Sequence, residues 1–227
     1  MTAVRRWRPL KVLAQHPSAV LLAVQFCFVL AYPHLEDNAV SRAVIGVAQM
    51  AVVYTAVWAV RRTPVLTWVA VTLGVPATVF TVLEALWPGS ELVVLVSAVL
   101  HAPFYFFVSY AMIRYLFHDT NVTRDELFAT AAAFTVVAWG FTYVFAAIQV
   151  VVPGSFIGAA EGPQREWFEL LFLSFSVLTS VGLSDVIPIA NHARSVVMIE
   201  QLAGVLYVGL VIARLVGLTA RGRQAGD

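Results

Sequence analysis

Long apolar segments recur along the whole chain and constrain its fold more than any other feature. Of the 227 residues, 60% are hydrophobic and only 12% are charged. A soluble domain of this length has too little interior to bury so many apolar side chains. A helix needs roughly 20 residues to cross a bilayer, and six segments come near or exceed that length: 18–32, which is the shortest, 40–60, 64–87, 92–117, 127–152 and 193–218. The sequence therefore predicts an all-α membrane protein with six transmembrane helices.

Basic residues indicate how these helices are oriented, because Lys and Arg gather in cytoplasmic loops. With the N-terminus inside, all but three of the 14 Lys and Arg residues lie on the cytoplasmic side, and the exceptions are Arg42, Arg165 and Arg194. Six crossings return the C-terminus to that side, so we expect a multi-pass protein of the cell (plasma) membrane with both termini cytoplasmic. Acidic residues on the outer side either concentrate cations there or simply fall where basic residues are excluded: Glu36, Asp37, Glu91, Glu161, Glu166 and Asp185.

A different kind of apolar segment lies between the fifth and sixth predicted helices. Residues 166–179 are apolar and aromatic but too short to cross the membrane and return, which is typical of a re-entrant helix. This segment leads into Thr179-Ser180-Val181-Gly182-Leu183-Ser184-Asp185, and Pro188 follows three residues later. Gly, Ser and Asp are also common in exposed turns, so a plain connection between two helices is the alternative for these seven residues.

The motif resembles the selectivity filter of the potassium channel pore-loop family, which typically reads TTVGYGD with a Pro two residues further on. Four positions match outright, namely Thr179, Val181, Gly182 and Asp185, and Ser180 keeps the hydroxyl of the family's threonine. The departures are Leu183 and Ser184, which replace a tyrosine and a glycine. The resemblance covers residues 127–218 as a helix, a pore loop and a helix.

This resemblance implies that backbone carbonyls replace the hydration shell of a permeating monovalent cation, K⁺ or Na⁺. The ion-binding residues would be Thr179, Ser180, Val181, Gly182, Leu183 and Ser184. It also implies a homotetramer in the lipid bilayer, because one filter segment cannot enclose an axis. The two departures lead us to expect weakened potassium selectivity. No cofactor, nucleic acid partner or metal beyond the permeant ion is expected, since the sequence has no basic stripe and no Cys/His cluster.

Two carboxylates near the motif are candidates for supporting the filter. Asp185 matches the aspartate behind the family's filter, and its candidate partners are Ser176 and Glu169. Glu200 lies at a depth where an ionisable side chain usually has a partner or a function. We expect it to face Ser176 or Ser174 on the re-entrant helix.

Gly204 is a candidate gating hinge. It falls 24 residues after Ser180, the same interval as the family's hinge glycine. A glycine inside a helix costs roughly 1 kcal/mol relative to alanine, and either bending or close helix packing would explain it.

The backbone of the filter imposes its own requirements. Gly182 adopts a positive φ without steric cost, whereas Ser184 would pay roughly 1–2 kcal/mol, so we expect difficulty in the outer half. Leu183 has no polar group, so it would be braced by packing alone. Apolar side chains that either hold the filter open or pack on lipid and helices are Trp167, Phe168, Phe172, Leu173 and Phe175.

Three regions are predicted. Residues 1–122 form a four-helix membrane domain without a voltage sensor, because the fourth span carries only Arg114. A signal peptide is an alternative for its start, but no small-x-small site precedes a soluble domain. Residues 123–220 form the pore domain, starting at a capping box from Thr123 to Glu126, and 221–227 form a short cytoplasmic tail. Glu84 and His101 are expected to be structural, with a pH effect as the alternative if they meet.

The leading functional hypothesis is a tetrameric channel that conducts cations passively, and not an enzyme. One alternative is a non-conducting membrane scaffold whose filter has decayed. The other is an intramembrane serine hydrolase that uses Ser184 with His192 as its base.

Overall fold

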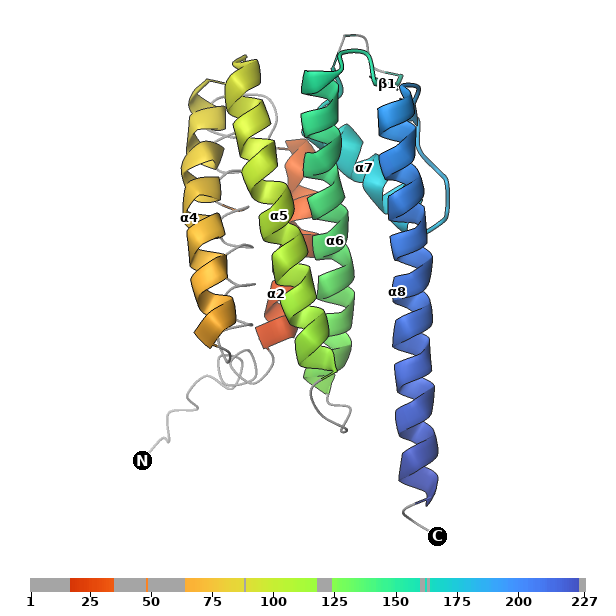
Figure 1. Cartoon of the computed structure of the whole chain (residues 1–227). Helices are drawn as coiled ribbons and strands as arrows, with labels where there is room; N and C mark the ends of the chain where they lie inside the picture. Colours follow the sequence, from red (N-terminus) through yellow and green to blue (C-terminus); the bar gives the residue numbers. More distant parts are fainter. Residues whose placement is uncertain are drawn as a thin grey trace, which may run out of the picture.

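Helices lying roughly side by side make up almost all of the described chain (Figure 1). The computed structural model describes residues 17–34, 48, 64–87, 89–117, 124–159, 162 and 164–224. The second predicted span, 40–60, falls outside these residues apart from Ala48. The basic residues before position 17 and the predicted helix start at Thr123 also lie outside them.

Five helices in the described part correspond to five of the six predicted spans. They are α2 (Pro17–Ala31), α4 (Pro64–Leu86), α5 (Glu91–Leu116), α6 (Arg124–Val151) and α8 (Asn191–Gln224). A short 3-10 turn, η1 (Tyr32–His34), follows α2. Four stretches of the described residues are long and apolar enough to cross a membrane: Pro17–His34, Glu91–Arg114, Asp125–Val151 and Asn191–Arg214. The apolar stretch within α4 is shorter, Val71–Glu84. The chain is thus a mostly helical membrane protein, and α8 continues past the predicted end at residue 218.

Two acidic residues in the first turn of α6 hold its neighbours at the same end of the bundle. Asp125 accepts hydrogen bonds from the backbone N–H of Ser18 (3.1 Å) and from its hydroxyl (2.9 Å). These bonds satisfy a free amide in the first turn of α2, where Pro17 occupies a position that needs no N–H donor. Glu126 forms an ion pair with Arg214 of α8 at 3.5 Å. Helices far apart in sequence are therefore fixed to α6.

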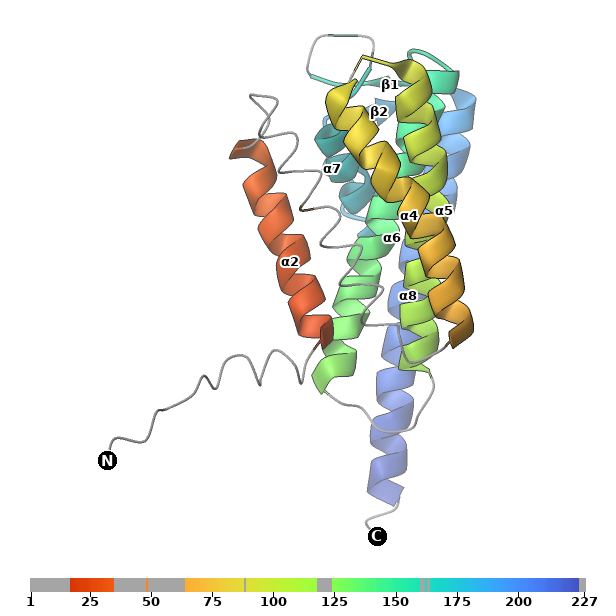
Figure 2. The same ribbon diagram turned by 90° about the vertical axis from the view of Figure 1, so that its left-hand side faces the viewer.

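Small residues on α6 let α2 and α5 approach it closely from different sides (Figure 2). Ala132 faces α2, where Gln25 donates a hydrogen bond to its carbonyl (3.4 Å). Ala133 faces α5, where Ser109 donates to its carbonyl (3.3 Å). Trp139 lies one to two turns further along α6 and is completely buried. Its ring is 5.0 to 5.9 Å from aromatic rings on three other helices, Phe28, Tyr105 and Trp167.

The remaining helix, α7 (Trp167–Leu178), is short and lies obliquely beside α6 and α8 near one end of the bundle (Figure 1). The chain enters and leaves this region through two short strands, β1 (Phe156–Ile157) and β2 (Ile187–Pro188), which pair antiparallel. The segment between them therefore begins and ends at the same place. The prediction of an all-α chain missed this pairing, because it joins residues about 30 positions apart and neither strand has a pattern of its own.

Trp139→Ala should destabilise the bundle by about 3–5 kcal/mol, because a large cavity would open where several helices meet. Trp68 of α4 is 75% exposed, so Trp68→Ala is the matched control and should change stability by less than about 0.5 kcal/mol. Thermal unfolding of the two purified variants in detergent, followed by circular dichroism, measures the difference. Equal midpoints would show that Trp139 does not hold the helices together.

Candidate functional site

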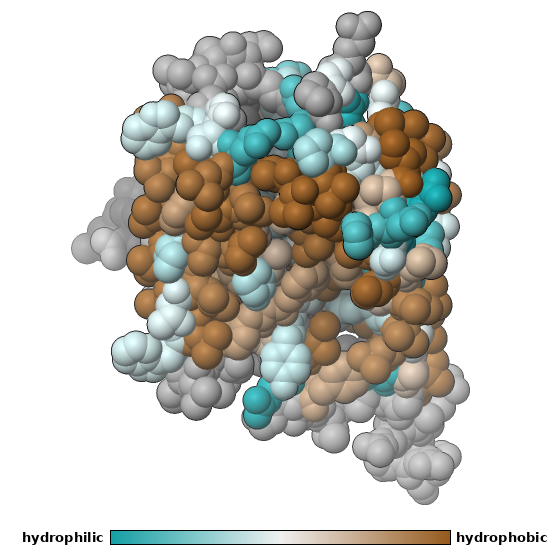
Figure 3. All heavy atoms as spheres, turned by 45° about the horizontal axis from the view of Figure 1, so that its top comes forward, coloured by the Kyte–Doolittle hydropathy of each residue, from teal (hydrophilic) through white to brown (hydrophobic). Residues whose placement is uncertain are grey.

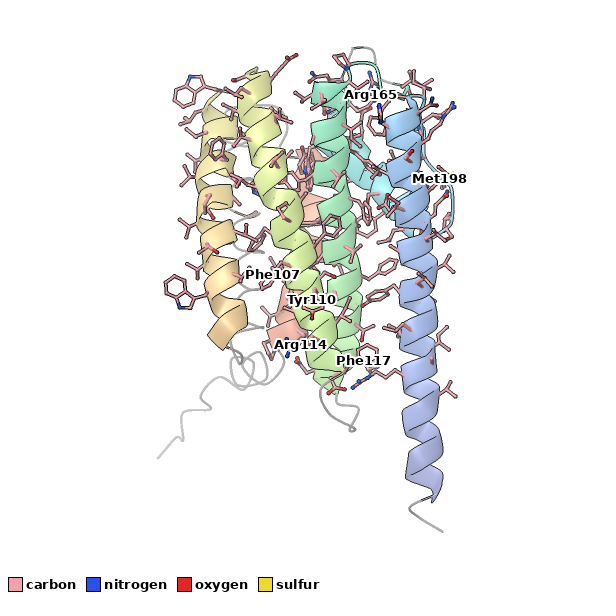
Figure 4. All side chains as sticks on the ribbon, viewed as in Figure 1. Phe107, Tyr110, Arg114, Phe117, Arg165 and Met198 are labelled. Carbon is pink, nitrogen blue, oxygen red and sulfur yellow. The ribbon has the colours of Figure 1, made fainter. Side chains whose placement is uncertain are left out.

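The N-terminus of α7 is anchored to α6 by a buried polar group. The backbone N–H of Arg165 donates to Gln149 Oε1 (2.8 Å), and Gln149 Nε2 donates to the carbonyl of Arg165 (2.9 Å). Glu169 accepts a hydrogen bond from the N–H of Glu166 (2.7 Å) and lies 3.8 Å from the Arg165 guanidinium. Arg165 lies at the end of the bundle opposite Arg114 (Figure 4). Sequence reasoning missed the link to Gln149, although a glutamine inside an apolar span was a usable signal.

The C-terminus of α7 controls the backbone of the loop that follows. The N–H of Ser180 donates to Val177 O (3.0 Å), and the N–H groups of Val181 and Gly182 both donate to Ser176 O (3.1 Å each). These bonds satisfy carbonyls that a helix end otherwise leaves without partners. A trans peptide unit points its N–H and its C=O in opposite directions. Three consecutive carbonyls, those of residues 179, 180 and 181, therefore point away from α7.

These carbonyls are available to a ligand. Among the described residues, no backbone or side-chain group donates a hydrogen bond to the carbonyl oxygens of residues 179–183. The loop is also open to its surroundings, since Val181 is 69% exposed and Leu183 is 71% exposed. A row of free oxygens on one side of a narrow loop is suited to coordinating a cation that has lost water.

Left-handed backbone geometry produces this arrangement. Ser180 has φ of 61° and Gly182 has φ of 72°, while Val181 between them does not have positive φ. The positive φ expected for Gly182 is confirmed. Ser180 was not expected to adopt one, and it bears the cost of roughly 1–2 kcal/mol that sequence reasoning had assigned to Ser184. Ser184 avoids that geometry and instead accepts a hydrogen bond from the N–H of Val186 at 3.1 Å.

Two expected supports of the outer loop are not formed within one chain. Asp185 is exposed and makes no hydrogen bond with any described residue. Its candidate partners are engaged elsewhere or buried, since Glu169 binds the start of α7 and the hydroxyl of Ser176 is buried without a partner among the described groups. Leu183 is 71% exposed, so the described residues of its own chain do not shield it. A serine hydrolase would require a hydrogen bond between Ser184 and His192. The hydroxyl of Ser184 makes no such bond.

Glu200 makes the contact expected on α7. It is completely buried, and its Oε1 forms a short hydrogen bond with the hydroxyl of Ser174. The same hydroxyl lies 2.8 Å from the carbonyl of Ala138 on α6. A serine hydroxyl has a single hydrogen, and a backbone carbonyl can only accept. The single hydrogen of Ser174 is therefore placed between two acceptors, Glu200 Oε1 and the carbonyl of Ala138.

Gly204 lies against the end of α7. A Cβ at this position would be 2.0 Å from the carbonyl oxygen of Leu178 and 2.9 Å from its carbonyl carbon. No side chain fits at that distance, so close packing accounts for this glycine. α8 is continuous through the position. The hinge role is not needed to explain the residue, and it stays a prediction.

Glu84 and His101 meet through Ser97 in the helices that precede the site. The hydroxyl of Ser97 donates to Glu84 Oε2 (2.7 Å) and lies 3.2 Å from His101 Nδ1. The His101 ring stacks on Tyr143 of α6, with centroids 4.4 Å apart. Tyr143 in turn lies 5.8 Å from Trp167, the first residue of α7. The polar group is therefore linked to α7 through the ring of Tyr143.

The apolar side chains expected to surround the loop have two different environments. Leu173 is buried in the core, and Phe168 stacks on Tyr32 of η1 with centroids 4.6 Å apart. Phe172 is 45% exposed. Phe28 of α2 also lies 5.9 Å from Trp167, so α2 and η1 both pack on the start of α7.

Gly204→Ala should lower stability by about 1–3 kcal/mol, the usual cost of overpacking, because α7 and α8 would be forced apart. Gly209, also in α8, has nothing within 4 Å of a Cβ, so Gly209→Ala is the matched control and should be neutral or stabilising by up to about 1 kcal/mol. Thermal unfolding in detergent tests both. A hinge without a packing role would leave Gly204→Ala as stable as its control.

Glu200→Gln should retain the stability of the original chain, because the amide oxygen of glutamine still accepts the hydrogen bond from Ser174. Glu200→Ala and Ser174→Ala should each cost about 1–3 kcal/mol by leaving a buried polar group unpaired or a cavity. The same unfolding assay compares the three variants. If Glu200→Gln is as damaging as Glu200→Ala, the hydrogen bond from Ser174 does not explain why a glutamate is buried here.

Comparison with known proteins covers the same part of the chain. Residues 122–221 match a family model described as "Ion channel". No curated protein and no solved structure was found to match the chain. The matched residues contain α6, α7, the loop with its free carbonyls and nearly all of α8. From residue 122 to residue 221, the chain is thus similar to ion channels, which agrees with the resemblance of its loop to the potassium channel pore-loop family.

Proposed function

We propose that four copies of this chain assemble around a common axis and conduct monovalent cations passively across the cell membrane. The filter consists of Thr179, Ser180, Val181, Gly182, Leu183 and Ser184. The pore is potassium-channel-like, with weakened selectivity for potassium over sodium. No chemical step or cofactor takes part in this function.

The observation that carries this proposal is the row of carbonyls at residues 179, 180 and 181, which point away from α7 while their peptide N–H groups are bound to it. Carbonyl oxygens on one side of one chain make only a partial shell around an ion. Four copies related by rotation close the shell. The exposure of Val181 and Leu183 in the single chain supports this assembly, because neighbouring copies would cover them.

The placement in the membrane follows from the charges. Arg114 and Arg214 lie at the end of the bundle that would face the cytoplasm in a chain of six spans. α7 then enters from the outer side as a re-entrant helix, and its C-terminus points toward the middle of the membrane. The partial negative charge of that helix end favours a cation. Asp185 lies at the outer mouth.

The weakened selectivity is attributed to the outer half of the filter. Ser184 lacks the left-handed backbone that Ser180 and Gly182 adopt, and its hydroxyl is bonded to the backbone of Val186. The carbonyls beyond Gly182 are therefore aligned differently from the inner three. The same observation favours the second candidate, a membrane scaffold whose filter no longer conducts.

Ion flux in liposomes separates these two functions. The full chain, reconstituted in liposomes, is assayed for K⁺ and for Na⁺ flux in separate experiments, and cross-linking in detergent reports the number of subunits. Flux of K⁺ by a tetramer supports the channel. A monomer, or a tetramer that passes neither ion, would refute it.

The paired substitution Leu183→Tyr with Ser184→Gly should raise the potassium-to-sodium permeability ratio by about tenfold or more, equivalent to at least ~1.4 kcal/mol of discrimination. Glycine permits the missing left-handed backbone, and tyrosine gives the outer loop a polar brace. The shift in reversal potential under opposed K⁺ and Na⁺ gradients measures the ratio. Ser184→Ala, which removes the hydroxyl without permitting positive φ, is the control and should leave the ratio near its original value.

A further inference from the structure

An apolar groove of about 400 Å³ lies in the half of the bundle away from β1 and β2. α6 forms its floor, and α5 and α8 form its walls. The groove is lined by Phe106, Tyr110, Val137, Leu178, Ala203 and Leu206, among others. In the space-filling view the surface on this side of the molecule is largely hydrophobic, and it is hollowed in its lower half (Figure 3). Its volume is in the range of sites that bind small ligands, roughly 300–1,000 Å³.

The lining groups suit a hydrocarbon. The hydroxyl of Ser109 donates to the carbonyl of Ala133 (3.3 Å), and the hydroxyl of Tyr207 donates to the carbonyl of Thr130 (2.6 Å). Two of the three hydroxyl groups at the wall are therefore already bonded inside the protein, and the third belongs to Tyr110, which is 56% exposed. An occupant of the groove finds aliphatic and aromatic surface, and water there would have few partners.

The two ends of the groove differ in charge. Leu178, at the end of α7, closes one end. One turn beyond the other end, Arg214 lies over the ring of Phe117, 4.9 Å from its centroid, and forms its ion pair with Glu126. Arg114 is also at this end, one turn beyond Tyr110 on α5, and is exposed (Figure 4). The second acidic residue in the first turn of α6, Asp125, is bonded to Ser18 of α2 and not to either arginine. The end of the groove therefore has two guanidinium groups for one carboxylate, that of Glu126.

We propose that the groove binds one acyl chain of an anionic phospholipid, whose phosphate lies at the end marked by Arg114 and Arg214. An apolar slot between membrane helices that ends in excess positive charge is complementary to an amphiphile with a hydrocarbon chain and a negative headgroup. A helix from a second copy would fill the apolar part but would leave the positive end uncompensated. In the proposed orientation the lipid belongs to the cytoplasmic leaflet. The site depends on the chain being a membrane protein and not on ion conduction.

Photolabelling with a lipid probe tests the site directly. The full chain is reconstituted with phosphatidylglycerol that carries a diazirine near the end of one acyl chain, and in parallel with the same probe built on phosphatidylcholine. Peptide mass spectrometry locates the label after illumination. We expect labelling of the lining segments of α5, α6 and α8, with a higher yield from phosphatidylglycerol.

Substitutions that fill the groove provide the decisive comparison. Val137→Phe and Ala203→Phe act from different helices, so a folding defect in one leaves the other informative. Each should reduce labelling of the groove about tenfold. Val79→Phe, on an exposed part of α4, is the matched control and should have no effect on labelling.

Arg114→Gln tests the charged end of the groove. It should reduce the labelling yield from phosphatidylglycerol about fivefold, as expected for ~1 kcal/mol per basic residue, and should leave the yield from phosphatidylcholine unchanged. Arg194→Gln, at the other end of α8, is its control.

Three results would overturn the proposal. Label spread evenly over the exposed faces of α4 and α8 would indicate only general contact with the bilayer. Unchanged labelling in both filled variants would place the lipid elsewhere. If filling the groove dissociates the oligomer while labelling persists, a second copy occupies the groove. Size-exclusion chromatography of each variant reports that last outcome, and none of these measurements requires ion flux.

Discussion

The last turn of α7 determines the orientation of the loop that follows it. Two of its carbonyls accept three consecutive N–H groups from the loop, and planar peptide units then direct the carbonyls of residues 179–181 to the opposite side. Two features are sufficient to orient these carbonyls. One is a helix C-terminus with free acceptors, and the other is a following backbone that alternates in handedness. The oxygens form a row because the N–H groups of the same peptide units point toward α7.

The rest of the pore segment keeps α7 in place so that this geometry persists. Gln149 and Glu169 fix its first turn, Ser174 connects its middle to α6 and α8, and the backbone of Gly204 fits against the carbonyl of Leu178 at its last residue. These contacts are made on both sides of the helix and by backbone as well as side chains. A short helix between longer ones has little freedom to tilt under such constraints. This matters for any site built from backbone oxygens, because a small rotation would misalign all of them together.

Much of the architecture followed from polarity and length. The predicted short helix at 166–179 differs by one residue at each end from α7, because Glu166 and Thr179 are its capping residues. The contact of Glu200 with Ser174 was expected, since a buried ionisable group in a membrane needs a partner. The described residues supply neither a partner for Asp185 nor packing for Leu183, and the strain was found at Ser180 and not at Ser184.

The sequence by itself determined that the chain lies in a membrane, where its helices run and which seven residues form the loop, because hydropathy, length and local motif are properties of neighbouring residues. Only the tertiary structure decided how the loop is used. The bonds from its N–H groups to α7, the steric reason for Gly204 and the groove between α5, α6 and α8 all arise where segments distant along the chain come within a few ångströms. Such contacts depend on how helices are placed against one another, which no local pattern of residues records.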